Sequence, residues 1–120
     1  STYDSTTISK TEENLNIGQY RTSLNRSYYA IFHAMRAVNI LRGYDSSKHS
    51  GVIAYFTQTF LKTERLDRGL SKIIKEASYL REKSDYDDFY IASKSEADNL
   101  ILIANEFIKL VEIYVDERLK

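Results

Sequence analysis

The sequence predicts an all-α protein, an up-and-down antiparallel bundle of four or five helices. Its 120 residues include no proline and only four glycines, so few positions interrupt a helix. Apolar residues recur three and four positions apart, and no stretch shows the strict alternation typical of a half-buried strand. The segments between these periodic stretches are short, which favours neighbouring helices that run in opposite directions.

The first half of the chain is predicted to be helical after a polar start. Residues 1–7 are expected to be disordered, because they offer little to pack against a core. Gly18 and Gly43 are predicted to end helices, since glycine is the usual residue just past a helix C-terminus. The helices expected in this half span residues 8–17, 19–42 and 49–62.

The second half is predicted to form two helices, over residues 66–81 and from Ser93 or Ser95 to about Leu119. Ser93 with Glu96 three positions later matches a capping box. The last helix carries two adjacent apolar rows, a sector wider than one packed neighbour needs. It is therefore either a central helix contacted by two others, or a helix with one row in an oligomer interface.

Length and composition place limits on the function. A chain of 120 residues suits a single domain spanning residues 1–120. Lys and Arg balance Asp and Glu at 17 each, so nucleic-acid binding needs a local basic patch. The absence of cysteine excludes disulfides and thiolate catalysis. No signal peptide or membrane-length apolar run is found, so a cytoplasmic protein without membrane contact is expected.

Residues 25–39 concentrate the chemically active side chains. On a helix, the seven steps from Arg26 to His33 amount to about 700°, so both side chains share a face, two turns apart. Ala30 and Ala37 fall on that face, while an apolar stripe lines the opposite side. A solvated face would carry Lys and Glu. Small residues beside a cationic pair indicate a surface that another molecule approaches closely.

Three sequence blocks occur together in this chain: NRSYYAIFHAMRAV at 25–38, SKHSGVIAYF at 47–56 and LREKSDY at 80–86. With the long apolar C-terminal helix, they resemble the HEPN domain (higher eukaryotes and prokaryotes nucleotide-binding), and the small stand-alone bacterial and archaeal members in particular. The resemblance implies a four- or five-helix bundle that dimerises. It also implies the family's Arg–x(4–6)–His motif, here Arg26 and His33. In active members this motif forms a metal-independent RNase centre in a cleft between two subunits.

The resemblance also implies partners. Active members often act as toxins beside a small nucleotidyltransferase, so a homodimer, RNA or a nucleotide, and a minimal nucleotidyltransferase are the expected partners. Other members are nucleotide- or RNA-binding modules without nuclease activity, which is the alternative function. Some toxins carry a tyrosine, modified by the partner, two positions after the histidine. Met35 stands there, so that regulation does not transfer. The family's first helix is normally longer than residues 8–17.

Arg26 and His33 are the candidate catalytic residues. Metal-free RNA cleavage needs a base for the ribose 2′-OH, an acid for the leaving 5′-oxygen, and a cation for the charged phosphorane. Histidine titrates near neutrality, and arginine binds two phosphate oxygens without losing its proton. A two-fold dimer would supply two histidines, one as base and one as acid. Products would end in a 2′,3′-cyclic phosphate, and no cofactor is expected.

Four neighbouring polar residues are candidates for substrate binding: Asn25, Tyr29, Arg36 and His49. Tyr29 and Arg36 each lie one turn from a member of the catalytic pair. His49 begins a predicted helix, where it either contacts a phosphate or simply caps the helix.

A purely structural role is the competing interpretation of the pair. In it, His33 is hydrogen-bonded in a helix interface, and Arg26 pairs with a carboxylate such as Asp85 or Asp87. No metal site is expected in either case. The two histidines are sixteen residues apart, and no carboxylate lies one turn from His33.

Overall fold

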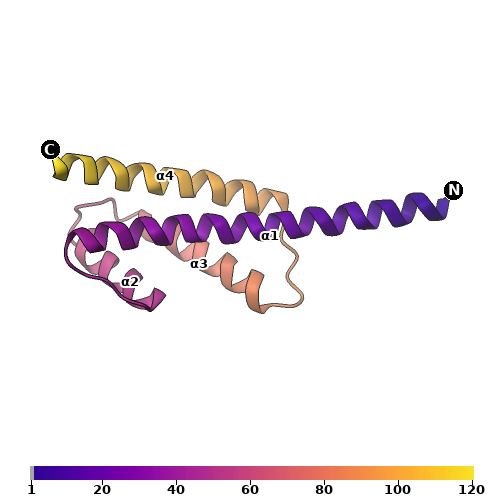
Figure 1. Cartoon of the computed structure of the whole chain (residues 1–120), viewed down its shortest axis with the longest axis horizontal. Coiled ribbons are helices and arrows are strands. Elements are labelled where there is room, and N and C mark those ends of the chain that lie inside the picture. The colour runs from indigo at the N-terminus through magenta and orange to yellow at the C-terminus, as the bar shows by residue number, and fades with distance from the viewer. Residues whose placement is uncertain (1) are drawn as a thin grey trace.

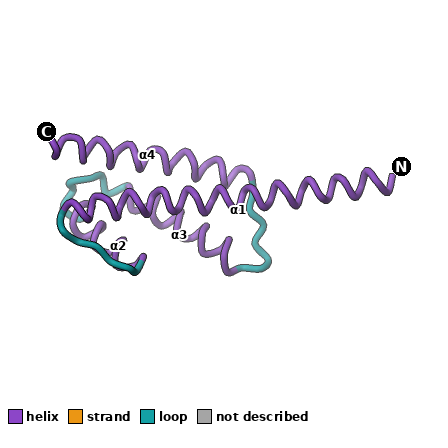
Figure 2. The backbone as a smooth tube through the Cα atoms, in the orientation of Figure 1, coloured by secondary structure: helices purple, strands orange, loops and turns teal. Residues whose placement is uncertain are grey.

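The computed structural model describes the backbone of residues 2–120 and the side chains of residues 15–120. The helices in it are α1 (Thr2–Leu41), α2 (His49–Phe56), the π-helical segment η1 (Thr57–Leu61), α3 (Leu70–Tyr86) and α4 (Lys94–Leu119). Loops join them, and no strand occurs in residues 2–120 (Figure 2). The predicted all-α helical bundle is confirmed.

α1 is one helix of 40 residues, not two helices separated at Gly18. The prediction that Gly18 ends a helix is wrong, because a glycine inside a helix costs only about 1 kcal/mol and the residues on both sides favour the helix. Gly43 follows the end of α1, with a φ of 82° that glycine adopts without strain. Disorder was predicted for residues 1–7. Residue 1 lies outside the described part, and α1 is assigned from Thr2.

The two glycines are expected to respond oppositely to alanine. Gly18 has no atom within 4 Å of an added Cβ, so Gly18→Ala should stabilise the fold by about 0.5–1 kcal/mol through helix propensity. Gly43→Ala should destabilise it by about 1 kcal/mol, because a Cβ is strained at positive φ. Urea unfolding of both variants and the wild type measures the shifts. A loss of stability in Gly18→Ala would contradict the uninterrupted helix.

The direction of each helix follows from its contacts with α1. α3 runs antiparallel to α1. The connection after α1 returns along that helix, so α2 starts beside Tyr28 and runs parallel to α1, with Asn39 donating to the carbonyl of Val52 at 3.0 Å. α4 also runs in the same direction as α1 (Figure 1). The predicted antiparallel order therefore holds from α2 to α4. It is wrong for α1 and α2, which are parallel because the connection between them returns along α1.

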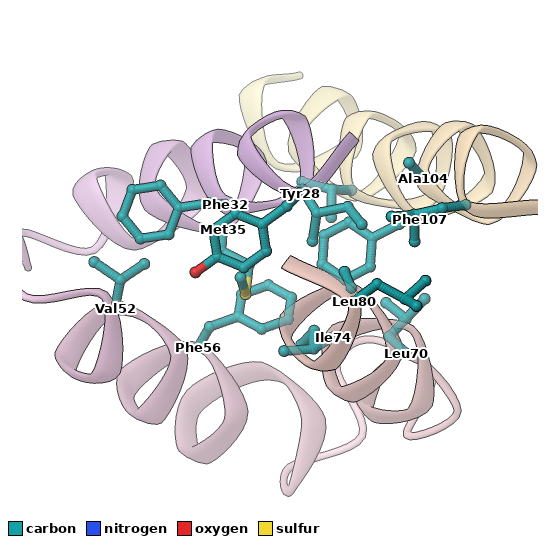
Figure 3. Close-up of a cluster of buried hydrophobic side chains, with 14 of the residues drawn as sticks. Tyr28, Phe32, Met35, Val52, Phe56, Leu70, Ile74, Leu80, Ala104 and Phe107 are labelled. Atoms are coloured by element: carbon teal, nitrogen blue, oxygen red, sulfur yellow. The ribbon is translucent and has the colours of Figure 1, made fainter. Parts of the chain in front are cut away.

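The hydrophobic core lies between α1 and the other helices (Figure 3). The apolar stripe predicted for α1 is buried at every position: Leu24, Tyr28, Ile31, Met35 and Val38. The rings of Phe60 and Phe107 pack on Phe56, with centroid distances of 5.5 and 5.7 Å. The wider π turn of η1 buries the consecutive residues Phe60 and Leu61 together.

α4 begins with the predicted capping box. The Ser93 side chain accepts a hydrogen bond from the Glu96 backbone N–H at 3.0 Å, and the Glu96 carboxylate accepts one from the Ser93 N–H at 3.3 Å. α4 then contacts both α1 and α3. These contacts bury the inner part of its apolar sector, while Ile101, Leu102 and Ile113 remain exposed. The sector therefore serves the bundle and still leaves apolar surface outside it.

Candidate functional site

Arg26 and His33 both lie on the surface of α1, and both are exposed. Because α1 is continuous through this region, the helix fixes their separation at two turns, about 10 Å along the axis. Each borders an open groove along the seam where α1 meets α4. The sequence prediction that the two share one face of one helix therefore matches the geometry of the chain.

The groove beside His33 is apolar and lined by small residues. It has a volume of about 530 Å³, and Ala30, Ala34 and Ala37 of α1 form one wall. The facing wall from α4 is aliphatic but also includes the carboxylates Glu112 and Asp116. The alanines therefore leave an open channel next to His33, and its charged lining is acidic.

The hollow beside Arg26 has a different lining. Its volume is about 790 Å³, and it is bounded by the small or polar residues Gly18, Gln19, Thr22, Ser23 and Ser27, with Leu15 and Ile101. Among the side chains of residues 15–120, no carboxylate lines it, and Arg26 carries the one charge at its wall. This end of the seam suits an anion better than the end at His33 does.

The other flank of His33 is an aromatic cluster that joins α1 to α2. The Tyr29 ring centroid lies 6.0 Å from that of His33 and 5.8 Å from that of His49. Phe32 lies 5.6 Å from His33 and 4.2 Å from His49. The only two histidines of the chain therefore contact the same two aromatic rings. Their distance along the sequence did not suggest this proximity.

His49 is half-buried and hydrogen-bonded rather than free in solvent. Its Nδ1 lies 3.1 Å from the Tyr28 hydroxyl. Burial raises the pKa of Tyr28, so this hydroxyl keeps its proton and can donate it to Nδ1. Burial, followed by the positive charge of Arg81 and of His33, lowers the pKa of His49. The imidazole is therefore held in its neutral form near pH 7.

The lowered pKa of His49 predicts that stability falls on acidification. The unfolded chain binds this proton near the ordinary pKa of 6.5, whereas the folded chain resists it. The contribution of His49 is therefore complete above that value and is lost as the pH falls from it toward the folded-state pKa. His49→Gln should flatten this part of the profile. Urea unfolding at about pH 7.5 and 5.5 compares the slopes, and equal slopes for both proteins would contradict the shift.

Arg36 is engaged within the fold. Its guanidinium forms two hydrogen bonds to the Asp45 carboxylate, at 2.7 and 2.8 Å, and so ties α1 to the connection that follows it. The hydrogen bonds from Arg36 lower the pKa of Asp45. A substrate phosphate would have to compete with this bidentate pair. Asn25, the remaining predicted binding residue, is half-buried on α1 next to Arg26.

The carboxylates proposed for Arg26 in the structural interpretation have other partners. Asp85 pairs with Arg81 at 3.5 Å, and Asp87 accepts a hydrogen bond from the Phe89 N–H at 3.0 Å. Among the side chains of residues 15–120, no carboxylate forms an ion pair with Arg26. The pairing with Asp85 or Asp87 is therefore not observed.

Arg81 is the residue that sequence reasoning missed. It reaches the aromatic cluster from α3, and its guanidinium carbon lies 4.9 Å from the Tyr28 ring centroid and 5.5 Å from that of Tyr29. Its Nη2 donates to the Tyr29 hydroxyl at 3.3 Å. The LREKSDY block, one of the three that resemble the HEPN domain, contains this arginine. Only the packing of α3 on α1 shows what the arginine contacts.

Neither a metal site nor a membrane-spanning helix is found where the structure can be described. In that part of the chain, no cluster of His, Asp and Glu side chains could hold a metal ion. Likewise, no helix traced there combines the length and apolar character needed to cross a bilayer.

The fold and site define an all-α bundle whose central helix presents an Arg–x6–His pair on an exposed face. The chain belongs to the HEPN domain family, which matches residues 5–114. The family resemblance of the three sequence blocks is therefore confirmed.

Relatives of the chain come from archaea and bacteria. It is 32% identical over 96 residues to the Methanocaldococcus jannaschii protein named "Putative toxin MJ0142", a match that covers 80% of this chain and 65% of the relative. It is 31% identical to "Putative toxin MJ0605" of the same organism, covering 84% and 80%. A Thermotoga maritima UPF0332 protein is 29% identical, covering 80% and 73%. No solved structure gives a significant match.

Proposed function

We propose that this chain is a HEPN-type toxin, a metal-independent endoribonuclease that uses Arg26 and His33. The observation that carries the proposal is that both side chains are exposed on one face of α1, along grooves at the seam with α4. A pair with only a structural role would be expected to be buried or paired. Two relatives that carry the name "Putative toxin" also support a toxin function.

The proposed chemistry is an in-line transesterification. One imidazole takes the proton from the ribose 2′-hydroxyl as its oxygen bonds to phosphorus, and a protonated imidazole gives a proton to the departing 5′-oxygen. The Arg26 guanidinium stabilises the added negative charge on the phosphorane oxygens. The P–O5′ bond breaks, leaving a 2′,3′-cyclic phosphate and a 5′-hydroxyl. No redox step and no metal ion is required.

The second imidazole is proposed to come from a second copy of the chain. The seam between α1 and α4 leaves Ile101, Leu41 and Leu119 exposed, which is apolar area that a dimer would bury. A two-fold axis near His33 would place two such histidines and two such arginines around one cleft. Sedimentation at roughly tens of micromolar checks this step. A monomer at that concentration would contradict the proposal of a cleft shared by two copies of the chain.

A binding module is the alternative, and one observation favours it. Glu112 and Asp116 line the groove beside His33 and would repel an RNA backbone. They are compatible with a basic protein surface, such as that of a nucleotidyltransferase partner. Met35, at the position of the modifiable tyrosine of some toxins, is buried in the core, so a partner would have to act elsewhere.

Cleavage of RNA by the purified protein in excess EDTA distinguishes the two functions. The nuclease proposal expects fragments that end in a 2′,3′-cyclic phosphate. The binding module would retain RNA or its partner without cutting. An activity that EDTA abolishes would contradict the metal-independent mechanism.

A further inference from the structure

Arg81 reaches the site from α3. Its guanidinium lies over the Tyr28 and Tyr29 rings and donates to the Tyr29 hydroxyl. The side chain is only 24% exposed, so water and salt screen these contacts less than they would on the surface. Arg81 is held in turn by Asp85, one turn later in α3. The guanidinium therefore contacts two tyrosine rings and forms an ion pair with one carboxylate, at 3.5 Å.

Two chains of contacts lead from Arg81 to the histidines. In the first, Arg81 contacts Tyr29, whose ring lies 6.0 Å from that of His33. In the second, Arg81 lies over Tyr28, whose hydroxyl is hydrogen-bonded to His49. Both tyrosines belong to α1, whereas His49 belongs to α2 and Arg81 to α3. The Arg81 side chain therefore contacts two tyrosines, one of which lies beside the His33 imidazole and the other of which is hydrogen-bonded to the His49 imidazole.

We propose that Arg81 is a positioning residue of this site, one that holds the rings of Tyr29 and His49 beside His33 from the neighbouring helix α3. Its guanidinium is engaged by two aromatic rings and a carboxylate, so it acts through Tyr28 and Tyr29. The inference rests on the proposed function only for its effect on RNA cleavage. Its effect on the two histidines can be measured without any substrate.

The charges around His49 make this role measurable. The groups of α1 that face it are Tyr28, Tyr29, Phe32 and His33. Arg81 faces it from α3, and Lys48 precedes it in the chain. Burial is the main cause of its lowered pKa, and the cations Arg81 and His33 add to that effect. Removal of Arg81 should therefore raise the pKa of His49 toward its ordinary value.

The experiment compares Arg81→Met with Lys83→Met by NMR titration of the histidine ring protons. Lys83 is a matched control because it also lies in α3 and over two tyrosine rings, Tyr79 and Tyr90, which are not in contact with either histidine. Both variants lose one positive charge. We expect a raised pKa of His49 and a weaker Tyr29–His33 nuclear Overhauser effect in Arg81→Met only. RNA cleavage by Arg81→Met should lose about ten- to a hundredfold in kcat, with KM little changed.

A folded Arg81→Met protein that keeps the wild-type pKa of His49 and the wild-type Tyr29–His33 contact would overturn the inference. If that variant does not fold, Arg81→Lys replaces it, because lysine keeps the charge without the planar donor group. The Tyr29–His33 contact should then weaken while the pKa of His49 stays lowered, and an unchanged contact again overturns the inference. Absence of RNA cleavage in the wild type would refute the nuclease proposal alone, since the titration still decides the role of Arg81.

Discussion

Replacement of His33 by alanine should lower the rate of RNA cleavage by about 10²–10⁴-fold, the usual contribution of a general acid or base. The loss should appear in kcat, because proton transfer acts in the transition state and the grooves beside the helix remain. His33 is exposed, so the variant should keep the helical content and melting temperature of the wild type. Cleavage of a labelled RNA in EDTA, followed over time, measures the effect.

Arg26 should behave as the electrostatic partner in the same assay. Arg26→Ala should cost a comparable factor, and Arg26→Lys should recover little, since lysine lacks the planar fork that binds two phosphate oxygens. Arg68→Ala is the matched control. Arg68 is also exposed and is paired only weakly, with Glu64 at 3.6 Å, outside the seam between α1 and α4. His33→Ala cleaving as fast as the wild type would end the nuclease proposal and leave the binding module.

Replacement of Phe107 by alanine should destabilise the fold by about 3–5 kcal/mol, more than either glycine substitution changes it. Phe107 is 0% exposed and packs against Phe56, so the truncation removes apolar burial and leaves a cavity at the centre of the bundle. A domain of this size is stabilised by only about 5–15 kcal/mol. The midpoint of urea unfolding should therefore fall by a large fraction of its wild-type value.

Phe89→Ala is the control for this measurement, because it removes the same atoms from the surface. Phe89 is 95% exposed in the loop before α4, so its truncation should change stability by less than about 0.5 kcal/mol. Similar losses in both variants would mean that Phe107 is not the core residue that the structure shows.

Local sequence patterns were sufficient to predict much of the fold. The three- and four-residue spacing identified the buried stripe of α1 from Leu24 to Val38, and Ser93 with Glu96 identified the start of α4. Both signals involve residues within a turn or two of each other, so their geometry depends little on the rest of the chain. Gly18 does not end α1, because the effect of one glycine is smaller than the summed helical preference around it.

The candidate site was predicted only as far as it lies on one helix. Arg26 and His33 are seven residues apart on α1, so their common face could be inferred from helix geometry. His49 and Arg81 reach the aromatic rings beside His33 from α2 and α3, and no periodicity relates positions on different helices. Arg36 was expected to face a substrate, but the backbone after α1 turns back and brings Asp45 to it.

The amino-acid pattern was enough to establish that this chain is all-helical, that α1 buries one stripe, and that Arg26 and His33 share its other face. Three further features follow only from the packing of the helices. α4 runs parallel to α1, the two histidines contact the same aromatic rings, and Arg81 of α3 lies over the rings of Tyr28 and Tyr29. The difference lies in the range of the interactions. Helix periodicity and capping act over a few residues, whereas the return of the connection after α1 and the packing of α3 bring together groups far apart along the chain.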